Sequence, residues 1–448
     1  MKKKVPSETS PKKERAFLVS ATIKGVEQLF SSEDSLLELK RLSQTAGLQI
    51  VGQLSQSLQR PNPVTFIGTG KVKELKALVE ETMADVVIFN DELSPRHQRE
   101  LEESLGQNVR ILDRTTLILD IFAQHAKTKE GMLQVELAQY EYYLPRLTGA
   151  WTHFARQAGG GGGRTGGVGG VGLRGPGETQ LEIDRRNIGK KIKYLKNEIE
   201  KVRKHRKLHR YKRKKSGLTN ILLIGYTNSG KSTILNKLSS SNVYVADQLF
   251  ATLDPTTRKI ELPGGYNSLL TDTVGFIDKL PTTLVAAFRA TLEEISEADL
   301  LLHVIDISHP NASEHEKSVF QTLEQLESSS IPVITILNKI DILPGDLVQV
   351  ESLKNSNYSV AISAATGEGI PELLSLIREV LFETMVPIRV KLPYVQGYLI
   401  SLFHGAGQVE QIINERKATL LTGRIPGRLL AQFQNWIVDK SSSTQEND

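Results

Sequence analysis

The sequence predicts a multidomain α/β protein, and three features of the chain lead to this fold class. Strand-like and helix-like runs alternate through the first third, a pattern typical of a mostly parallel sheet covered by helices. A glycine-containing octapeptide at 225–232 stands between an apolar run and a helix-compatible run, which indicates a second α/β domain. Beyond residue 386 the pattern becomes that of a small α+β domain.

Within the N-terminal domain, each element follows from the spacing of its apolar residues. The expected strands are residues 16–23, 48–52, 63–67, 84–90 and 109–113. The expected helices are residues 34–45, 71–82 and 95–105. Gly68, Thr69, Gly70 and Lys71 imitate a phosphate loop, but the spacing is too short and Val72 replaces the required hydroxyl. A strand-to-helix turn is therefore favoured over a second nucleotide site.

Apolar residues at heptad-like spacing predict two helices after this domain. Each helix has one apolar stripe, here called its seam, along which it can pack against a partner, while its other faces carry charged residues. The seams are formed by Leu133, Leu137, Tyr140 and Leu144, and by Leu181, Ile188, Ile192, Leu195, Ile199 and Val202. Two such helices joined by a loop predict an antiparallel helical hairpin.

The loop of this hairpin, residues 159–177, holds twelve of the 35 glycines of the chain. Such a segment cannot contribute to a core and is expected to be disordered when free. Arg164 and Arg174 lie inside it, and Trp151 and Phe154 precede it. Glycine lets backbone approach RNA closely, while arginine and aromatic side chains can pair and stack. Contact with RNA is therefore favoured over a passive connector.

Positive charge is concentrated at the end of the second helix. Residues 201–215 contain ten of the 56 Lys and Arg residues and no acid. If these ten were absent, 46 basic residues would stand against 51 acidic ones, and the net charge would be −5 instead of +5. A run of this kind commonly marks contact with nucleic acid or an anionic surface, and a solvated helix face is the alternative.

The octapeptide fits the phosphate-loop pattern G-x-x-x-x-G-K-[ST]. Its glycines let backbone N–H groups surround phosphates, and the following helix adds the favourable end of its dipole. Lys231 is expected to reach the β- and γ-phosphates, and the Ser232 hydroxyl to ligate Mg²⁺. The nucleotide-binding residues expected here are Gly225, Tyr226, Thr227, Asn228, Ser229, Gly230, Lys231, Ser232 and Thr233.

A strand-like run is followed by the residues that specify the base, Asn338, Lys339, Ile340 and Asp341. The Asp341 carboxylate can accept hydrogen bonds from the imino and amino groups of guanine. Adenine has no such pair of donors and would leave the carboxylate unpaired, so the motif favours GTP over ATP. The edge of the base is expected to be braced by Ser363, Ala364 and Ala365.

Two segments between these motifs are expected to respond to the γ-phosphate. The first consists of Phe250, Ala251, Thr252, Leu253 and Asp254, and Thr252 is the natural second hydroxyl for Mg²⁺. The second consists of Asp272, Thr273, Val274 and Gly275. Asp272 can hold Mg²⁺ through water, and the N–H of Gly275 can approach the γ-phosphate. The predicted catalytic residues are Lys231, Thr252 and Gly275.

The last domain carries no motif for chemistry, and an interaction module is expected there. Its strands are expected at 388–392, 409–414 and 418–421, and its helices at 398–404 and 427–436. The predicted divisions of the chain are a disordered tail at 1–14, the N-terminal α/β domain at 15–127, the hairpin at 128–215, a P-loop GTPase domain at 216–385, the small α+β domain at 386–440 and a disordered tail at 441–448.

Composition excludes several classes of protein. The chain has no cysteine, which excludes disulfides and thiolate chemistry. No run approaches 18 apolar residues, so no transmembrane helix is expected. The charged N-terminus has no apolar region after it, which argues against a signal peptide. A monomeric cytoplasmic protein without an integral membrane segment is expected.

Four motifs resemble those of the HflX GTPases, and the similarity extends over most of the chain. The motifs are residues 175–182 (GPGETQLE), 225–233 (GYTNSGKST), 250–258 (FATLDPTTR) and 272–276 (DTVGF). The resemblance implies a ribosome-associated GTPase that binds the large ribosomal subunit and its rRNA through the N-terminal domain and hairpin. It further implies the separation of stalled or idle ribosomes under stress, and it links the N-terminal domain to ATP.

Two other functions are compatible with the same motifs. One is a GTPase switch that acts on non-ribosomal RNA or on an RNA-modifying enzyme. The other is a GTP-sensing protein that regulates a protease or another partner.

Phe276 stands where many GTPases place the glutamine that orients the attacking water. HflX-like proteins share this hydrophobic residue, so slow intrinsic hydrolysis that the ribosome stimulates is expected. Asn228 is a residue with which phosphate loops can bind K⁺, whose charge would act where an arginine finger does; a plain polar loop residue is the alternative.

Overall fold

The fold was analysed in a computed structural model, which describes residues 13–25, 29–106, 108–147, 180–215, 218–239, 249–279, 294–325, 331–343, 358–382, 385–426 and 429–438. The side chains of residues 205–215 are outside this description. The glycine-rich loop at 159–177 and the predicted tail at 441–448 also lie outside the described residues.

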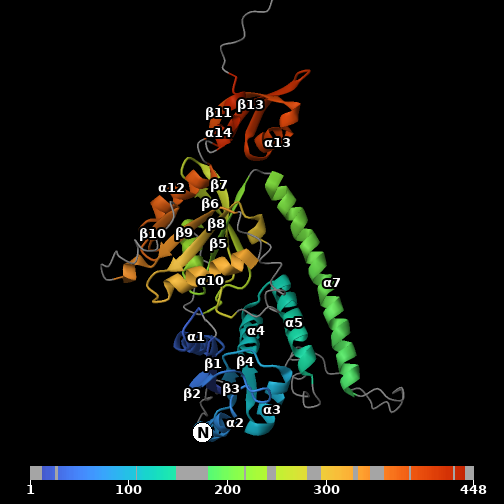
Figure 1. The fold of residues 1–448 in the computed structure, drawn as a ribbon, viewed down its shortest axis with the longest axis vertical. Coiled ribbons are helices and arrows are strands. Elements are labelled where there is room, and N and C mark those ends of the chain that lie inside the picture. Colours follow the sequence, from blue (N-terminus) through green and yellow to red (C-terminus); the bar gives the residue numbers. More distant parts are fainter. Residues whose placement is uncertain are drawn as a thin grey trace, which may run out of the picture. The chain divides into compact units, whose positions relative to one another are not determined.

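The N-terminal α/β domain is built on a parallel sheet of order β2-β1-β3-β4 (Figure 1). Its strands are β1 (Arg15–Ile23), β2 (Gln49–Leu58), β3 (Val86–Phe89) and β4 (Arg110–Asp113). Because β1 and β3 are buried on both faces, they are continuous apolar runs rather than alternating ones. The predicted parallel sheet is confirmed.

Three predicted helices of this domain are also confirmed, at α1 (Ser32–Thr45), α2 (Thr69–Thr82) and α3 (Pro95–Leu105). Serine side chains cap α1 and α3 by accepting hydrogen bonds from first-turn amides. Gly68 is the residue before α2, and Gly70 and Lys71 lie in its first turn. The imitation phosphate loop is therefore the beginning of a helix, as predicted.

The strand predicted at 63–67 is wrong. The side chain of Asn62 accepts hydrogen bonds from the amides of Val64 (2.8 Å) and Thr65 (3.2 Å), which folds the chain into a turn. Phe66 then takes a left-handed conformation with φ of 65°. Asparagine competes with strand pairing through its own backbone contacts, and the apolar pattern alone does not reveal this competition.

Helix α4 (Arg114–His125) was not predicted, because it is buried almost all round and lacks an amphipathic period. It leads to α5 (Lys129–Tyr143), beside which lies the long α7 (Gln180–Lys215) (Figure 1). The predicted seam is the side of α7 that is shielded from solvent. Leu195 is fully buried, and the other described seam residues, Ile188, Ile192, Ile199 and Val202, are half-buried. Ion pairs from Lys191 to Glu136 (3.1 Å) and from Lys196 to Glu141 (2.7 Å) link the two helices.

The central sheet has the order β10-β9-β8-β5-β7-β6. Its strands are β5 (Thr219–Gly225), β6 (Thr256–Leu262), β7 (Tyr266–Asp272), β8 (Leu300–Asp306), β9 (Val333–Asn338) and β10 (Ser359–Ile362). Strands β5, β8, β9 and β10 pair in parallel, so their carboxyl ends meet at one edge. Among the described residues, α8 (Lys231–Ser239) follows β5 in the chain, α10 (Ala312–Gln325) follows β8, and α12 (Ile370–Leu381) follows β10. Strands β6 and β8 were not predicted.

The last part of the chain forms an antiparallel sheet of order β11-β13-β12. Its elements are β11 (Met385–Pro393), α13 (Gly397–Ala406), β12 (Gln408–Asn414), β13 (Ala418–Pro426) and α14 (Leu430–Phe433). The predicted order of strand, helix, two strands and helix is confirmed. Phe403 of α13 and Phe433 of α14 are fully buried in its core.

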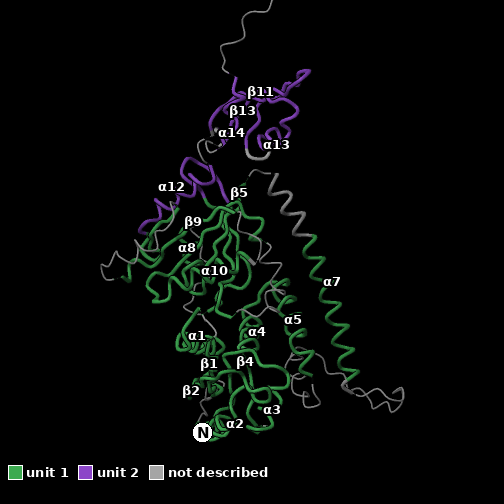
Figure 2. The backbone as a smooth tube through the Cα atoms, in the orientation of Figure 1, with its two compact units in different colours: residues 1–260, 269–367 green, residues 261–268, 368–448 purple. Residues whose placement is uncertain are grey.

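The chain divides into two compact units (Figure 2). The first contains residues 1–260 and 269–367, and the second contains residues 261–268 and 368–448. The phosphate loop and the N-terminal α/β domain belong to the first unit. Among the described helices, none is long and apolar enough to span a membrane.

A glycine in β2 gives a test of packing in the first sheet. A Cβ on Gly52 would lie 2.4 Å from Cε2 of Phe17, whose ring is buried and cannot withdraw. We expect Gly52→Ala to lower the free energy of unfolding of this domain by about 1–3 kcal/mol. Gly70→Ala is the matched control, because a Cβ there meets open space within a helix. Denaturant titration should show unchanged or increased stability for the control, and equal effects of both changes would contradict the packing argument.

Candidate functional site

The phosphate loop connects β5 to α8 through conformations that side chains resist. Gly225 has φ of 147° and Gly230 has φ of 99°, while Asn228 adopts the left-handed region with φ of 61°. A Cβ on Gly225 would lie 2.3 Å from the carbonyl oxygen of Val304, and one on Gly230 would lie 2.2 Å from Nδ2 of Asn338. The two motif glycines are thus required by the close approach of neighbouring strand ends.

Lys231 begins α8 and is directed back over the loop. Its Nζ donates hydrogen bonds to the carbonyl oxygens of Gly225 (3.1 Å) and Tyr226 (2.7 Å). Burial lowers the pKa of Lys231 to about 8, although the nearby charge of Asp272 acts in the opposite direction. An anionic ligand at the loop would restore the preference for the charged ammonium, because opposite charges favour ionisation.

Two hydroxyls and a carboxylate converge beside Lys231. Ser232 Oγ donates to Asp272 Oδ2 (2.6 Å) and lies 2.8 Å from Thr252 Oγ1. Oδ1 of Asp272 is buried and has no hydrogen-bond partner among the described residues. Burial raises the pKa of Asp272, and the charge of Lys231 counteracts this shift. Oxygen ligands of this kind suit Mg²⁺, so the three residues fit the ion predicted from the motifs.

The segment from Asp272 to Phe276 lies against the phosphate loop. Thr273 donates through Oγ1 to the carbonyl oxygen of Leu223 (2.6 Å). The Phe276 amide donates to Gly225 (3.1 Å), and the Thr227 amide donates to Phe276 (2.8 Å). Phe276 is buried in the core, so its ring cannot contact water at the phosphates. A Cβ on Gly275 would lie 2.8 Å from Cα of Thr227, which explains the glycine.

Asn338 links three of the predicted motifs. Its Nδ2 donates to the carbonyl oxygen of Ser229 (2.8 Å), and its Oδ1 accepts from the amide of Ala364 (3.0 Å). The same side chain is only 1% exposed, so both bonds are shielded from water. One amide thereby holds the phosphate loop and the segment at 363–365 at fixed positions.

The residues after Asn338 present their polar groups outward. Lys339 has a left-handed backbone with φ of 70°, and its Nζ pairs with Asp306 Oδ2 (2.6 Å). Asp341 is exposed in a short 3-10 helix, where its carboxylate is free to meet a base. Sequence reasoning missed Asp306, although its position at the end of the apolar run that forms β8 was a signal for a residue at the functional edge.

A cavity of about 50 Å³ brings eleven of the predicted residues together. It is lined by Thr227, Asn228, Gly230, Lys231, Ser232, Thr233, Phe250, Ala251, Thr252, Thr273 and Gly275. Leu253 is buried in the core that the N-terminal domain forms, and Val274 packs against that core. Asp254 contacts the beginning of α5 instead of the cavity.

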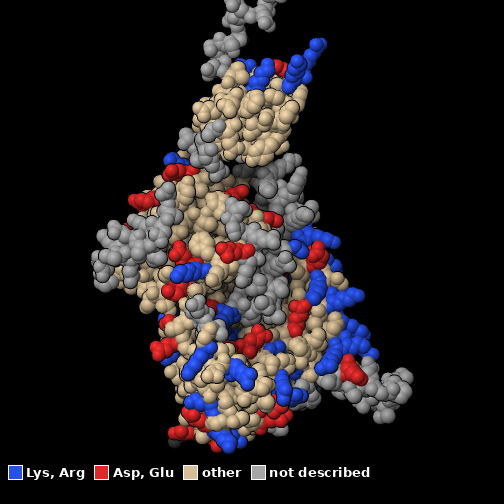
Figure 3. All heavy atoms as spheres, viewed as in Figure 1, with Lys and Arg blue, Asp and Glu red and all other residues tan. Residues whose placement is uncertain are grey.

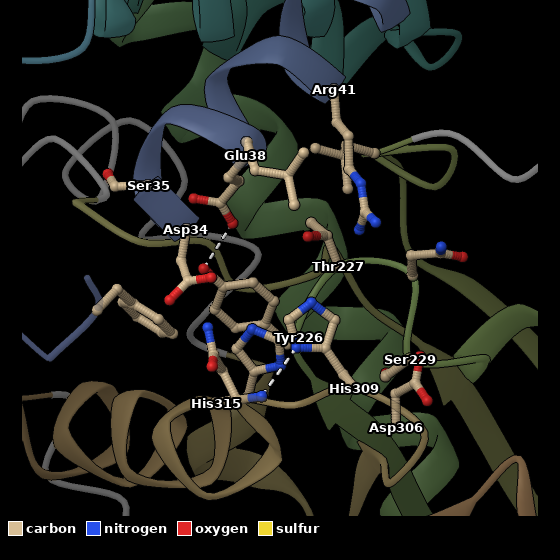
Figure 4. A pocket seen from close by; sticks show the side chains of 15 residues that line it. Asp34, Ser35, Glu38, Arg41, Tyr226, Thr227, Ser229, Asp306, His309 and His315 are labelled. Carbon is tan, nitrogen blue, oxygen red and sulfur yellow. Dashed lines mark hydrogen bonds between the residues drawn. The ribbon is translucent and has the colours of Figure 1, made fainter. Parts of the chain in front are cut away.

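A second cavity, of about 60 Å³, also borders the phosphate loop, with Thr227 and Asn228 lining both cavities (Figure 4). It is lined from the N-terminal domain by α1 residues that include Asp34, Glu38 and Arg41. Tyr226 donates from its hydroxyl to Glu38 Oε1 (2.6 Å), and its ring stacks on His315 with 3.9 Å between ring centres. Burial lowers the pKa of His315 to about 4, so this ring stacks in its neutral form at neutral pH. Helix α1 is thus docked on the loop that forms the phosphate site.

Comparison with known protein families gives matches along most of the chain. The family models described as GTP-binding GTPase N-terminal, GTP-binding GTPase Middle Region and 50S ribosome-binding GTPase match residues 33–123, 125–213 and 220–339. A GTPase HflX of Alkalihalophilus pseudofirmus is 43% identical over 92% of this chain and 93% of its own. A GTPase HflX of Escherichia coli is 42% identical over 84% of this chain and 86% of its own.

Solved structures of GTP-binding proteins are also similar. The structure of SsGBP in complex with GDP has a TM-score of 0.45 at 25% identity and covers 83% of this chain and 99% of its own. A GTP-binding protein of Sulfolobus solfataricus in complex with GDP has a TM-score of 0.42 at 25% identity, with the same coverage.

The bridge made by Asn338 gives a test of the site. Asn338→Asp keeps the shape and the oxygen that accepts from Ala364, but it removes the donor to Ser229 and buries a charge. We expect GDP affinity to fall by about tenfold or more, which corresponds to about 1.4 kcal/mol. Asn414→Asp is the control, because Asn414 uses only its oxygen as an acceptor for Thr419. Fluorescent GDP titration measures both, and unchanged affinity for Asn338→Asp would contradict the bridging role.

Proposed function

The chain belongs to the HflX family of GTPases, and on this premise we propose that it hydrolyses GTP on the large ribosomal subunit, splitting or rescuing stalled or idle ribosomes under stress. The observation that carries the proposal is the charge along α7. The description of the matched family model as a 50S ribosome-binding GTPase supports the same partner.

Helix α7 combines one apolar side with a basic, exposed surface. Figure 3 shows Lys and Arg side chains gathered along this helix. The exposed cations are Arg185, Arg186, Lys190, Lys193, Lys196, Lys201, Arg203 and Lys204. A helix docked by its seam and basic on its outer side is suited to the phosphates of rRNA, which would release counterions on binding. The basic residues of 205–215 extend the same run in the sequence.

The nucleotide site supplies binding and positioning rather than a covalent step. Lys231 and the loop amides would hold the β- and γ-phosphates, and Asp341 would read guanine. Ser232, Thr252 and Asp272 would hold Mg²⁺, which neutralises charge that develops on the phosphates. The amide of Gly275 would face the γ-phosphate. Phe276 stands where many GTPases place the glutamine that orients the attacking water, and its ring is buried, so hydrolysis is expected to depend on the ribosome.

A bound K⁺ would supply part of the charge that an arginine finger provides in other GTPases. Asn228 supports this role, because it lines the phosphate cavity with a left-handed backbone. We expect ribosome-stimulated hydrolysis to be at least about tenfold faster in K⁺ than in Na⁺. In Asn228→Gly, which tolerates the same backbone, the ratio should fall towards one. Equal rates in the two salts for the unchanged protein would refute the cation role.

Sedimentation with ribosomes tests the proposed partner. We expect the protein to comigrate with the large subunit when a non-hydrolysable GTP analogue is bound, and to remain free with GDP. Binding only to other RNA would favour the switch on non-ribosomal RNA. Hydrolysis that ribosomes do not change, without comigration, would favour the GTP-sensing regulator.

Variants of the basic run extend the same experiment. Five basic residues of α7 are replaced by glutamine in one variant, namely Lys201, Arg203, Lys204, Arg206 and Lys207. The control replaces five lysines of the N-terminal tail, namely Lys2, Lys3, Lys4, Lys12 and Lys13. The α7 variant should bind more weakly, with a salt dependence that is shallower by about 0.7–0.9 for each phosphate that the helix no longer neutralises. An unchanged slope would assign the run to a solvated helix face.

A further inference from the structure

The first segment expected to respond to the γ-phosphate is attached to the N-terminal end of α5. Asp254 Oδ2 accepts hydrogen bonds from the amides of Lys127 and Thr128, each at 2.8 Å. The Thr128 hydroxyl donates to Asp254 Oδ1 and accepts from the Gly131 amide (3.0 Å), which makes Thr128 the cap of α5. A carboxylate at this place also meets the positive end of the helix dipole.

Gly131 shows that the chain is shaped for this contact. A Cβ on Gly131 would lie 2.3 Å from Oδ1 of Asp254, so a residue with a side chain would push the carboxylate away. Glycine in the first turn of a helix is otherwise unfavourable by up to about 1 kcal/mol relative to alanine. The absence of a side chain at Gly131 therefore leaves room for the Asp254 carboxylate in the folded protein.

The same segment is also anchored on the other side of Thr252. Phe250 takes a left-handed backbone with φ of 58° and is only 3% exposed. Its ring packs edge-on against Phe122 of α4, with 4.7 Å between ring centres. Phe250 and Asp254, two residues before and two residues after Thr252, thus contact α4 and α5. Thr252 between them lies 2.8 Å from Ser232.

We propose that Asp254, with its partners Thr128 and Gly131, positions Thr252 for GTP hydrolysis, so that the beginning of α5 forms part of the active GTPase. This inference rests on the proposed role of Thr252 as a ligand of Mg²⁺ beside the γ-phosphate. Asp254 acts through Thr252 and is a positioning residue. One anchor on each side of Thr252 restricts its backbone far more than a single anchor would, because the short chain between the two anchors has few other conformations.

Through this contact, a movement of the helical hairpin would change the position of Thr252 in the nucleotide site. Helix α5 is linked to α7 by two ion pairs, and α7 carries the basic surface. A ligand that shifts α5 would alter the position of Thr252, and by linkage GTP would alter the affinity of α7 for its partner. The route lies within the chain, so stimulation would not require the partner to insert a residue into the site.

The test compares Asp254→Asn, Thr128→Ala and the double variant in the full-length protein. Because the contact acts through Thr252, we expect each single change to lower affinity for a non-hydrolysable GTP analogue by about tenfold at limiting Mg²⁺. GDP affinity should stay within about twofold, since Thr252 serves the γ-phosphate state. The double variant should lose less affinity than the sum of the two single changes, because both disturb the hydrogen bond between the Thr128 hydroxyl and the Asp254 carboxylate. Thr128→Ser keeps the hydroxyl and should retain full affinity.

Two controls separate the possible causes of failure. Glu261→Gln removes an exposed carboxylate of β6 and should leave all affinities unchanged. Thr252→Ala tests the underlying role: if it leaves GTP-analogue affinity intact, the proposed function of Thr252 fails. If Thr252→Ala weakens the analogue while Asp254→Asn does not, only the positioning role is overturned. Equal decreases in affinity for GDP and the analogue, or additive effects in the double variant, would also overturn it.

Discussion

The side-chain amide of Asn338 fixes the geometry on which the site depends. Parallel strands bring their carboxyl ends to one edge, but the loops that leave this edge need a further tie. Asn338 donates to the phosphate loop at Ser229 and accepts from the amide of Ala364, and it is almost fully buried. Because the bonds are shielded from water, losing one leaves a buried polar group unpaired, which is costly. The phosphate-binding and base-reading parts of the site are therefore held as one body.

A buried network also holds the N-terminal domain to the phosphate loop. Arg114 is only 2% exposed and pairs with Glu38, and it donates to the carbonyl oxygen of Asp278 (3.2 Å). Tyr226 donates to Glu38 (2.6 Å) and accepts from the amide of Asp278 (2.6 Å). Buried charges are tolerated only when they are paired and hydrogen-bonded, so this arrangement disfavours alternative dockings. Asp278, two residues after Phe276, is thereby attached to the N-terminal domain. In the same way, Asp254, two residues after Thr252, is attached to the beginning of α5.

These attachments bear on the proposed dependence of GTP hydrolysis on a partner. The Phe276 ring is buried in the core, and the segment around Thr252 is attached to α4 through Phe250 and to the beginning of α5 through Asp254. Under the proposed function, the position of these helices would control hydrolysis, and the basic α7, which is ion-paired with α5, would sense a polyanionic partner.

The sequence by itself determined the features that depend on neighbouring residues: the phosphate loop, the tetrapeptide at 338–341, the heptad seam of α7 and most helices and strands. The sequence pattern did not predict the turn that the Asn62 side chain makes at 63–67, where local hydrogen bonds compete with strand pairing. It did not predict α4 either, because a helix buried on nearly all sides has no amphipathic period. Only the tertiary structure decided which residues support the site. Asp254 and Thr128 are 126 positions apart, and Glu38 and Tyr226 are 188 apart. Such contacts arise from how domains pack, and no spacing pattern within a single segment encodes them.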